Sequence, residues 1–527
     1  MPMLEKIGQM YGQRSLNSLK NFFINNKSIK TRFLATLFIN IARIGLGFIS
    51  GIVIARGLGP ADYGNYNFLL GSFGSITALL DMGTPTAFYT FLSQKKRGMK
   101  FYIYYFLWTL IQFLVILSLI AVIFPGSWLE KIWLGHKKGM IVMAFMASFM
   151  MNKVWQIATY AGESIRATII VQLHNIIIAG LYLCLVFIMF FLQCLSIQNI
   201  FIIIALIYFL LSFLLMNRLK ADLTVKEKVT LSDIINEFKA YCAPLVFYSI
   251  AGFFYSFADM WLLQKFGGAV QQGFYSIGLR FSSICLIATT SILQVFWKEI
   301  AEANASGNRQ RLYYLYTRIS RALCFIGAAG ACFLIPFSRE ILIFLFGSKY
   351  ETGWLCLAVM FLYPVHQSLG QINGTYFFAS AQTRLYTKIG IFFMIISIPT
   401  AYFLLAPSSG AIKGLGLNST GMALKMVILQ AIGVNVSTYY ISRVSGWKFS
   451  FLYQFGTIGL LLFASFAIKI FLMWFFNTLN VFFHPLVVMV FCAPFYILAV
   501  GLVLYLFPGL SGLEKREVLN FLKLKRI

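Results

Sequence analysis

The chain has 527 residues, of which 60% are hydrophobic and only 11% are charged. A soluble domain carries about 25% charged residues, so this composition, with a mean hydropathy of +0.80, excludes a soluble protein and predicts an integral membrane protein along the whole chain. The net charge of +27 does not indicate nucleic-acid binding, because the basic residues lie mostly in alternate loops and no soluble basic domain is present to hold a duplex.

Fourteen apolar segments are long enough to cross a hydrocarbon core, which takes about 20 helical residues. The predicted fold class is therefore an all-α polytopic membrane protein. In chain order, the predicted spans are residues 33–55, 64–92, 101–124, 140–163, 167–192, 196–217, 241–265, 273–297, 320–346, 352–379, 385–406, 416–442, 451–475 and 481–507.

A short break joins the first two spans, where two glycines and a proline end the first helix, and Tyr63 and Tyr66 are expected at the level of the lipid headgroups. A similar break joins spans 7 and 8. Both contain a Gly-x4-Gly-x-Tyr pattern, in Gly59-Pro-Ala-Asp-Tyr-Gly64-Asn-Tyr66 and in Gly268-Ala-Val-Gln-Gln-Gly273-Phe-Tyr275. Because each break opens a series of six spans, the pattern predicts an internal repeat. Such repeats are common in secondary transporters, whose substrate sites lie between the two halves.

The repeat predicts how the chain is divided. A basic segment, residues 1–32, precedes an N-lobe of spans 1 to 6, residues 33–217. The longest loop, residues 218–240, links this lobe to a C-lobe of spans 7 to 12, residues 241–443. Spans 13 and 14, residues 444–507, and a basic tail, residues 508–527, follow. The amphipathic stretch at residues 309–318 is expected to lie along the inner membrane surface before span 9.

The distribution of basic residues predicts the orientation of the chain. Most of the 43 Lys and Arg residues lie in the terminal segments and in the loops after even-numbered spans. By the positive-inside rule, both termini are expected in the cytoplasm. The opposite loops hold only Arg56, Lys131, Lys137, Lys138, Lys265, Lys349 and Lys413.

Basic side chains inside the spans are candidates for substrate binding, because an ionisable group is costly to insert into a membrane and is seldom kept without use. Arg43, Lys153, Arg280 and Lys425 lie in spans 1, 4, 8 and 12, two in each lobe. Together they predict a cationic cavity, and guanidinium groups suit phosphate oxygens. The competing interpretation is that some are structural, paired with an aspartate or reaching to an interface. Lys469 is a further base, in the appended span 13.

Acidic side chains inside the spans are fewer. Asp81 lies in span 2 beside a glycine and a proline that should kink the helix and free backbone carbonyls, and Asp259 lies in span 7 just before the repeated break. Each is expected either to pair with a cavity arginine or to carry the proton or sodium ion that couples transport. Glu163 and Arg166, at the cytoplasmic end of span 4, are expected to form a gate or an interfacial ion pair.

No metal, cofactor or catalytic residue is predicted. The eight cysteines lie in or beside apolar segments without a Cys-x-x-Cys pair, and we interpret them as packing residues. The four histidines are scattered along the chain. The sequence contains no P-loop, no zinc-protease or serine-hydrolase motif and no dinucleotide fingerprint.

Several motifs carry a resemblance to a known family. They are Ile54-Ala-Arg-Gly-Leu-Gly-Pro-Ala-Asp-Tyr-Gly-Asn-Tyr66, Leu79-Leu-Asp-Met-Gly-Thr-Pro-Thr-Ala87, Asp259-Met-Trp-Leu-Leu263 with Gly273-Phe-Tyr-Ser276, Leu345-Phe-Gly-Ser-Lys-Tyr350, Ala379-Ser-Ala-Gln-Thr-Arg384 and Ser409-Gly-Ala-Ile-Lys-Gly-Leu-Gly416. In these motifs residues 31–443 resemble bacterial polysaccharide transporters. These are the O-antigen and lipid-linked oligosaccharide flippases of the multidrug/oligosaccharidyl-lipid/polysaccharide (MOP) exporter superfamily.

The resemblance implies a V-shaped bundle of two six-helix lobes in the bacterial inner membrane. Such a transporter moves a polyprenyl-diphosphate-linked glycan, such as an O-antigen, capsule or exopolysaccharide unit, to the outer leaflet by alternating access. The related lipid II flippases use arginines in spans 1 and 8, the spans that hold Arg43 and Arg280. The implied partners are the lipid-linked oligosaccharide, membrane lipids and other polysaccharide-assembly proteins, with coupling to H⁺ or Na⁺ left open.

Three alternatives remain. A drug or organic-cation antiporter of the same superfamily would be expected to have a more acidic cavity than this one. A membrane glycosyltransferase or polymerase would need acidic catalytic residues in outer loops, where only Asp62, Glu130 and Glu351 are available. A scaffolding role is disfavoured, because intramembrane charges are costly to keep without use.

Overall fold

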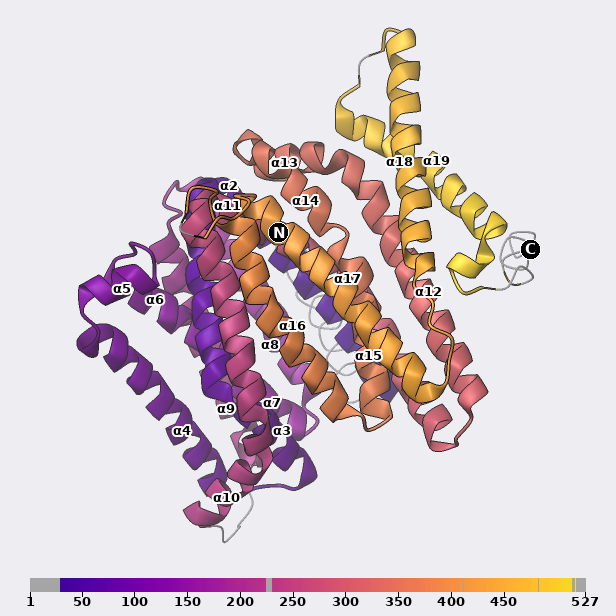
Figure 1. The fold of residues 1–527 in the computed structure, drawn as a ribbon. Coiled ribbons are helices and arrows are strands. Elements are labelled where there is room, and N and C mark those ends of the chain that lie inside the picture. Colours follow the sequence, from indigo (N-terminus) through magenta and orange to yellow (C-terminus); the bar gives the residue numbers. More distant parts are fainter. Residues whose placement is uncertain (1–28, 224–229, 411, 482, 514–516, 518–527) are drawn as a thin grey trace, which may run out of the picture. The chain divides into compact units, whose positions relative to one another are not determined.

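The structure is a computed structural model that describes residues 29–223, 230–410, 412–481, 483–513 and 517 (Figure 1). Throughout these residues the regular elements are helices, and no strand occurs among them. By their contacts the residues form two units, Met1–Leu58 with Leu69–Phe253 (unit 1) and Gly59–Phe68 with Phe254–Ile527 (unit 2). Each unit is described by itself.

Unit 1 contains the first half of the helices. In chain order they are α2 (Ile29–Asp81), α3 (Thr84–Gln94), α4 (Met99–Ser118), the π-turn η1 (Leu119–Ile123), α5 (Gly126–Ile132), α6 (Lys138–Phe149), the π-turn η2 (Met150–Val154), α7 (Trp155–Ser164), α8 (Thr168–Phe191), α9 (Ile197–Leu223), α10 (Leu231–Cys242), the 3₁₀ turn η3 (Ala243–Leu245) and the start of α11 (Val246–Ala305).

Unit 2 contains the rest of α11 and the later helices, together with a short part of α2. In chain order the later elements are α12 (Arg309–Leu334), η4 (Ile335–Phe337), α13 (Ser338–Phe346), η5 (Ser348–Gly353), α14 (Trp354–Met360), α15 (Tyr363–Ala379), α16 (Thr383–Leu405), α17 (Asn418–Ser445), α18 (Leu452–Thr478), α19 (Pro485–Leu506) and η6 (Pro508–Leu510), where η4, η5 and η6 are 3₁₀ turns.

Twelve helical segments of the described chain are long and apolar enough to cross a membrane. Two of these segments lie in α2 and α11, which are interrupted by the positive-φ glycines Gly59 and Gly268 and hold two predicted spans each. The twelve segments therefore account for the fourteen predicted spans. The chain is an all-α, multi-pass membrane protein, as its composition predicts.

The repeated glycine pattern has two separate physical causes. Gly59 and Gly268, the first glycine of each pattern, have φ of 76° and 79°, a conformation that side chains disfavour. The second glycines allow a close approach within unit 2. A Cβ at Gly64 would overlap with the carbonyl oxygen of Ala269, and a Cβ at Gly273 would overlap with the carbonyl of Pro60. The two breaks therefore pack directly against each other, backbone to backbone.

The tyrosines of these breaks lie inside the protein. Tyr63 is 1% exposed and Tyr66 is 7% exposed, so the expectation that they face lipid headgroups is wrong. The ring of Tyr63 lies 6.5 Å from that of Tyr350, in the 3₁₀ turn η5. Asn65, in the same break, accepts a hydrogen bond of 2.8 Å from the side chain of Gln264. These polar aromatic side chains are therefore packed inside unit 2 and are not exposed to lipid headgroups.

The predicted linker, residues 218–240, is mostly helical where it is described. Its second part forms α10, which begins with a capping box between Thr230 and Asp233. Ile234 and Phe238 of α10 pack on a cluster of aromatic residues from α3 and α4 in unit 1. The carboxylate of Glu237 also pairs with Arg97, which is only 2% exposed. The helix that precedes α11 is therefore fixed to unit 1 by both apolar and ionic contacts.

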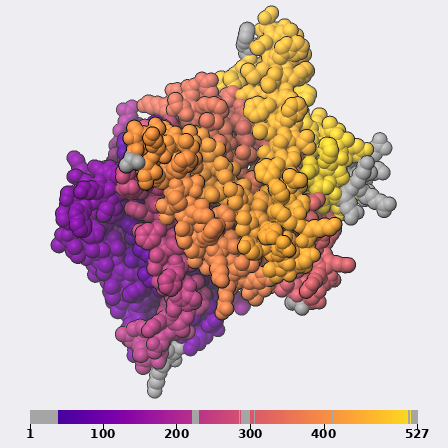
Figure 2. All heavy atoms as spheres, in the orientation of Figure 1, coloured from indigo at the N-terminus to yellow at the C-terminus, as the bar shows by residue number. Residues whose placement is uncertain are grey.

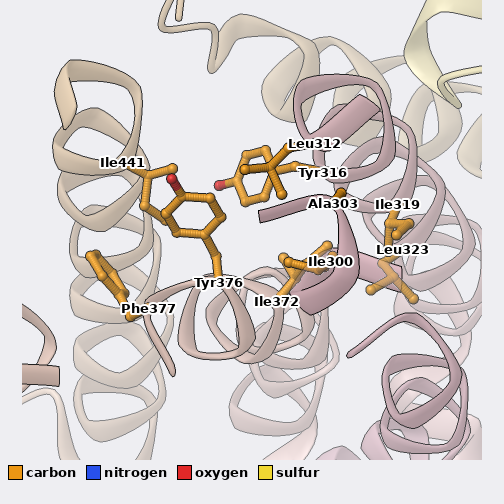
Figure 3. Packing of buried hydrophobic residues seen from close by; sticks show 10 residues of the cluster. All are labelled: Ile300, Ala303, Leu312, Tyr316, Ile319, Leu323, Ile372, Tyr376, Phe377 and Ile441. Carbon is orange, nitrogen blue, oxygen red and sulfur yellow. The ribbon is translucent and has the colours of Figure 1, made fainter. Parts of the chain in front are cut away.

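The amphipathic stretch at residues 309–318 is not a separate surface helix. It forms the first turns of α12, a continuous helix of 26 residues that also contains span 9. Its apolar side belongs to a cluster in unit 2 formed with α11, α15 and α17, in which the rings of Tyr316 and Tyr376 lie 5.8 Å apart (Figure 3). The expectation fails because this apolar face packs on neighbouring helices rather than on lipid.

Helices α18 and α19 hold spans 13 and 14, and within unit 2 both contact α12. Their atoms lie at the surface on the right of Figure 2, coloured yellow. Large apolar side chains on both helices are exposed, including Phe463 at 75% and Leu498 at 71%. Such faces suit contact with lipid chains.

Candidate functional site

Asp81 and Lys153 form an ion pair in unit 1. Asp81 is the last residue of α2, and the chain then turns through Met82 and Gly83, both with positive φ, before α3 begins. Lys153 lies in the π-turn η2, which interrupts the helix of span 4. Its side chain is 1% exposed, whereas that of Asp81 is 22% exposed. The ammonium group is thus held inside the protein, and one side of its carboxylate partner remains accessible.

The expected distortion at the end of α2 is present. The side-chain amide of Gln112, in α4, donates a hydrogen bond of 2.8 Å to the carbonyl oxygen of Leu80. The kink therefore leaves the carbonyl oxygen of Leu80 free of helix hydrogen bonding, and the side chain of Gln112 supplies its hydrogen bond. The interruption of span 4 by a π-turn is a second irregularity next to the same pair, and such turns occur often at functional sites.

Asp259 and Lys425 form a second ion pair, in unit 2, between α11 and α17. Both are buried, with side-chain exposures of 8% and 1%. Lys425 Nζ also lies 5.0 Å from the ring centroid of Tyr255, one turn before Asp259. The second carboxylate oxygen of Asp259, Oδ1, is buried and accepts no hydrogen bond from any residue that the structure describes. This pair therefore retains an unused acceptor in the interior.

The two pairs are similar in chemistry but not in position along the repeat. Asp81 follows the first break, in span 2, whereas Asp259 precedes the second break, in span 7. The bases lie in span 4 and span 12. A charged pair buried in a membrane protein carries no net charge, so pairing lowers the cost of keeping each lysine within a span.

The two arginines have different surroundings. Arg43 is exposed on α2 and forms no ion pair with any carboxylate in the described part of the chain. It lies within electrostatic range of Tyr208, on α9 in unit 1. Arg280 is partly buried in α11 and belongs to unit 2. Each unit therefore supplies one of the predicted arginines and one of the predicted lysines.

Glu163 and Arg166 lie at the end of α7. The backbone N–H of Arg166 donates to the carbonyl oxygen of Glu163 at 2.9 Å, and Arg166 has a positive φ of 64°. Their side chains do not form an ion pair with each other in this structure. Glu163 is half-buried, and Arg166 is exposed.

Lys469, in α18, links this helix to α13 and η4 within unit 2. Its ammonium group lies 2.9 Å from the carboxylate of Glu340 in α13 and also donates to the carbonyl of Pro336. The ring of Phe337 lies 4.6 Å away. The sequence analysis did not single out Glu340 as a partner for Lys469. Among the described residues, no group of three or more His, Cys, Asp or Glu side chains could hold a metal ion.

Comparisons with known proteins agree with this architecture. The model of a family described as "Polysaccharide biosynthesis protein" matches residues 30–297. No curated protein sequence matches the chain. Among solved structures, the lipid II flippase MurJ in an inward closed conformation is similar with a TM-score of 0.64 at 14% identity, covering 90% of this chain and 98% of the other.

Two further solved structures are transporters of the MOP superfamily. A multidrug resistance MATE family transporter in an inward-facing conformation has a TM-score of 0.58 at 15% identity, covering 76% of this chain and 96% of the other. A transporter from Pyrococcus furiosus has a TM-score of 0.52 at 14% identity, covering 78% and 94%. At these identities the likeness concerns the fold alone.

Proposed function

Because the chain belongs to the polysaccharide biosynthesis protein family, we propose that it is a flippase for a polyprenyl-diphosphate-linked oligosaccharide. The oligosaccharide is an O-antigen, capsule or exopolysaccharide repeat unit, and it moves from the cytoplasmic to the outer leaflet by alternating access. The protein works without a cofactor as a transporter rather than an enzyme. It resides in the bacterial inner membrane with both termini in the cytoplasm, and it meets other polysaccharide-assembly proteins there.

One observation carries the choice of an anionic substrate. Within the spans, Asp81 and Asp259 are each paired with a buried lysine, whereas Arg43 has no carboxylate partner among the described residues. The excess charge at membrane depth is therefore positive. A diphosphate offers several oxygen acceptors, and charge-assisted hydrogen bonds from guanidinium groups to such oxygens are strong. The polyprenyl tail stays in the lipid, so that the protein has to shield only the polar head.

The four bases have two roles in this proposal. Arg43 and Arg280 attract the diphosphate, and Lys153 and Lys425 reach it when substrate oxygens compete with Asp81 and Asp259 for their ammonium groups. Asp259 is the better candidate for a coupling H⁺ or Na⁺, because its Oδ1 is buried and has no partner in the described structure. Glu163 and Arg166 gate the cytoplasmic end of span 4.

The same pairing disfavours the organic-cation antiporter. An organic-cation site needs a carboxylate whose full negative charge is available, and here a lysine ammonium group offsets the charge of each intramembrane aspartate, which leaves Oδ1 of Asp259 an acceptor for a small ion at most. An antiporter would have to displace a lysine before it could bind its substrate.

Binding of the substrate tests this function. A short-chain polyprenyl-diphosphate oligosaccharide is titrated into the purified protein and into the variant Arg43→Gln. We expect affinity to fall about tenfold or more in the variant, which is the effect of one charge-assisted contact. Arg384→Gln is the matched control, since Arg384 is an exposed arginine without a described partner. Equal binding by all three proteins would contradict the assignment of Arg43.

A further inference from the structure

A small hollow of about 40 Å³ lies within unit 2, and neither of the two ion pairs contributes to its lining. One face of α12 forms a wall, because its lining residues recur at helical spacing. The other walls come from α15, α17, the segment after α17 and the first turn of α18. The lining residues are Tyr313, Tyr316, Thr317, Ser320, Arg321, Leu369, Asn373, Thr438, Ser442, Trp447, Lys448, Ser450 and Tyr453.

The charged side chains of this lining are all basic. The lining contains two bases, Arg321 and Lys448, and no carboxylate. Several hydroxyl groups and the indole of Trp447 add donors, and the ring of Trp447 lies 5.6 Å from that of Tyr316. A site rich in donors, positively charged and without acidic groups is complementary to an oxyanion.

Arg321 is held in place and forms no ion pair with any carboxylate among the described residues. One guanidinium nitrogen donates to the carbonyl oxygen of Gly509 at 2.7 Å, and the guanidinium carbon lies 5.2 Å from the ring centroid of Tyr453. Its Nε is buried and has no acceptor in the part of the chain that the structure describes. Two other arginines on α12 do form ion pairs: Arg311 pairs with Glu299, and Arg318 pairs with Glu517.

The wall beneath the hollow is rigid. Tyr316 donates a hydrogen bond of 2.6 Å to the side chain of Asn373, whose amide in turn donates to the carbonyl of Val434 and the hydroxyl of Thr438. Tyr316 also belongs to the buried apolar cluster of Figure 3. Because this wall is already ordered, its donors can bind a ligand with little further loss of conformational entropy.

We propose that this hollow binds the phosphate group of an anionic ligand, with Arg321 and Lys448 as the charged contacts. The loop before α12 and the segment after α17 both lie on the side where the charge pattern predicts the cytoplasm. The phosphate comes either from an anionic phospholipid or from a soluble phosphate. This site is separate from the paired residues of the proposed transport site and does not depend on which substrate is transported.

Calorimetric titration of the full-length protein in zwitterionic detergent tests the proposal. Dioctanoyl phosphatidic acid and inorganic phosphate are the two probes. We expect saturable binding of at least one probe, weakened about tenfold in Arg321→Gln and about threefold in Lys448→Gln, whose side chain is exposed. Binding of phosphatidic acid alone identifies a lipid as the source, and equal binding of inorganic phosphate identifies a soluble ligand.

Arg443→Gln is the matched control. Arg443 also lies over a tyrosine ring, that of Tyr439 at 5.4 Å, but it does not line the hollow. Its variant should bind both probes as the wild type does. The proposal is wrong if the wild type binds neither probe, or if Arg443→Gln loses as much affinity as Arg321→Gln. Unchanged binding in Lys448→Gln would also contradict it, even if Arg321→Gln failed to fold.

Discussion

The Cα of Gly64 faces the carbonyl oxygen of Ala269 so closely that no side chain fits between them. In the reciprocal contact, Gly273 faces Pro60. The break between spans 1 and 2 and the break between spans 7 and 8 therefore form one backbone contact within unit 2. This contact explains the second glycine of the repeated pattern without invoking a substrate.

We predict that Gly64→Ala and Gly273→Ala each destabilise the protein, because the added methyl group meets backbone that cannot move aside cheaply. The expected loss is about 1–3 kcal/mol for each variant. Gly74→Ala is the control, since Gly74 lies in α2 with open space around its Cα, and alanine favours a helix. Thermal unfolding of the purified variants measures the effect. Equal midpoints for Gly64→Ala and Gly74→Ala would rule out the close contact.

Removal of one member of a buried pair should cost more than removal of a surface charge. Lys153→Met leaves Asp81 without its counter-ion, and we expect the free energy of unfolding to fall by about 3–5 kcal/mol. The double variant Asp81→Leu with Lys153→Met should recover most of this loss, because no isolated charge remains. Arg311→Gln provides the comparison: it breaks an exposed pair and should cost less than about 1 kcal/mol. A double variant no more stable than Lys153→Met would show that the pair is not the cause.

Coupling to an ion gradient should depend on Asp259 more than on Asp81. In proteoliposomes, an imposed H⁺ or Na⁺ gradient is expected to accelerate transport by the wild type and by Asp81→Asn but not by Asp259→Asn. The reason is that Oδ1 of Asp259 is a buried acceptor without a described partner. Transport without a gradient provides the control for folding. A gradient response that survives in Asp259→Asn would remove this residue from the coupling mechanism.

Lys469 should act on stability and not on substrate binding. Its contacts with Glu340 and Pro336 tie α18 to the region of α13. We expect Lys469→Met to lower the free energy of unfolding by about 1.5–3 kcal/mol, as for other hydrogen bonds to charged groups. Substrate affinity, measured by titration at a temperature where the variant is folded, should equal that of the wild type. A tenfold loss of affinity would instead place Lys469 in the transport site.

Much of the fold follows from local sequence signals. The lengths of the apolar segments predict the spans, and the glycines predict the breaks in α2 and α11, because both effects depend on a few adjacent residues. The choice of partner for each charge does not follow in this way. Lys153 and Asp81 are 72 positions apart, and Lys425 and Asp259 are 166 apart, so helix packing decides which base meets which acid.

Other features of the site also depend on tertiary contacts. The π-turn that contains Lys153 has no sequence signal in Met150-Met-Asn-Lys-Val154. Tyrosine is common at membrane interfaces, but Tyr63 and Tyr66 are both buried in unit 2. The family resemblance of the opening motif, by contrast, agrees with the family model that matches residues 30–297.

Flipping of a fluorescent polyprenyl-diphosphate oligosaccharide in proteoliposomes tests the central claim most directly. The wild type should move the lipid between leaflets, and Arg280→Ala should lose this activity while its thermal unfolding stays close to that of the wild type. Exchange of an organic cation for protons is measured in the same vesicles. If the wild type exchanged the cation and moved no lipid-linked oligosaccharide, the flippase would be excluded and the antiporter would replace it.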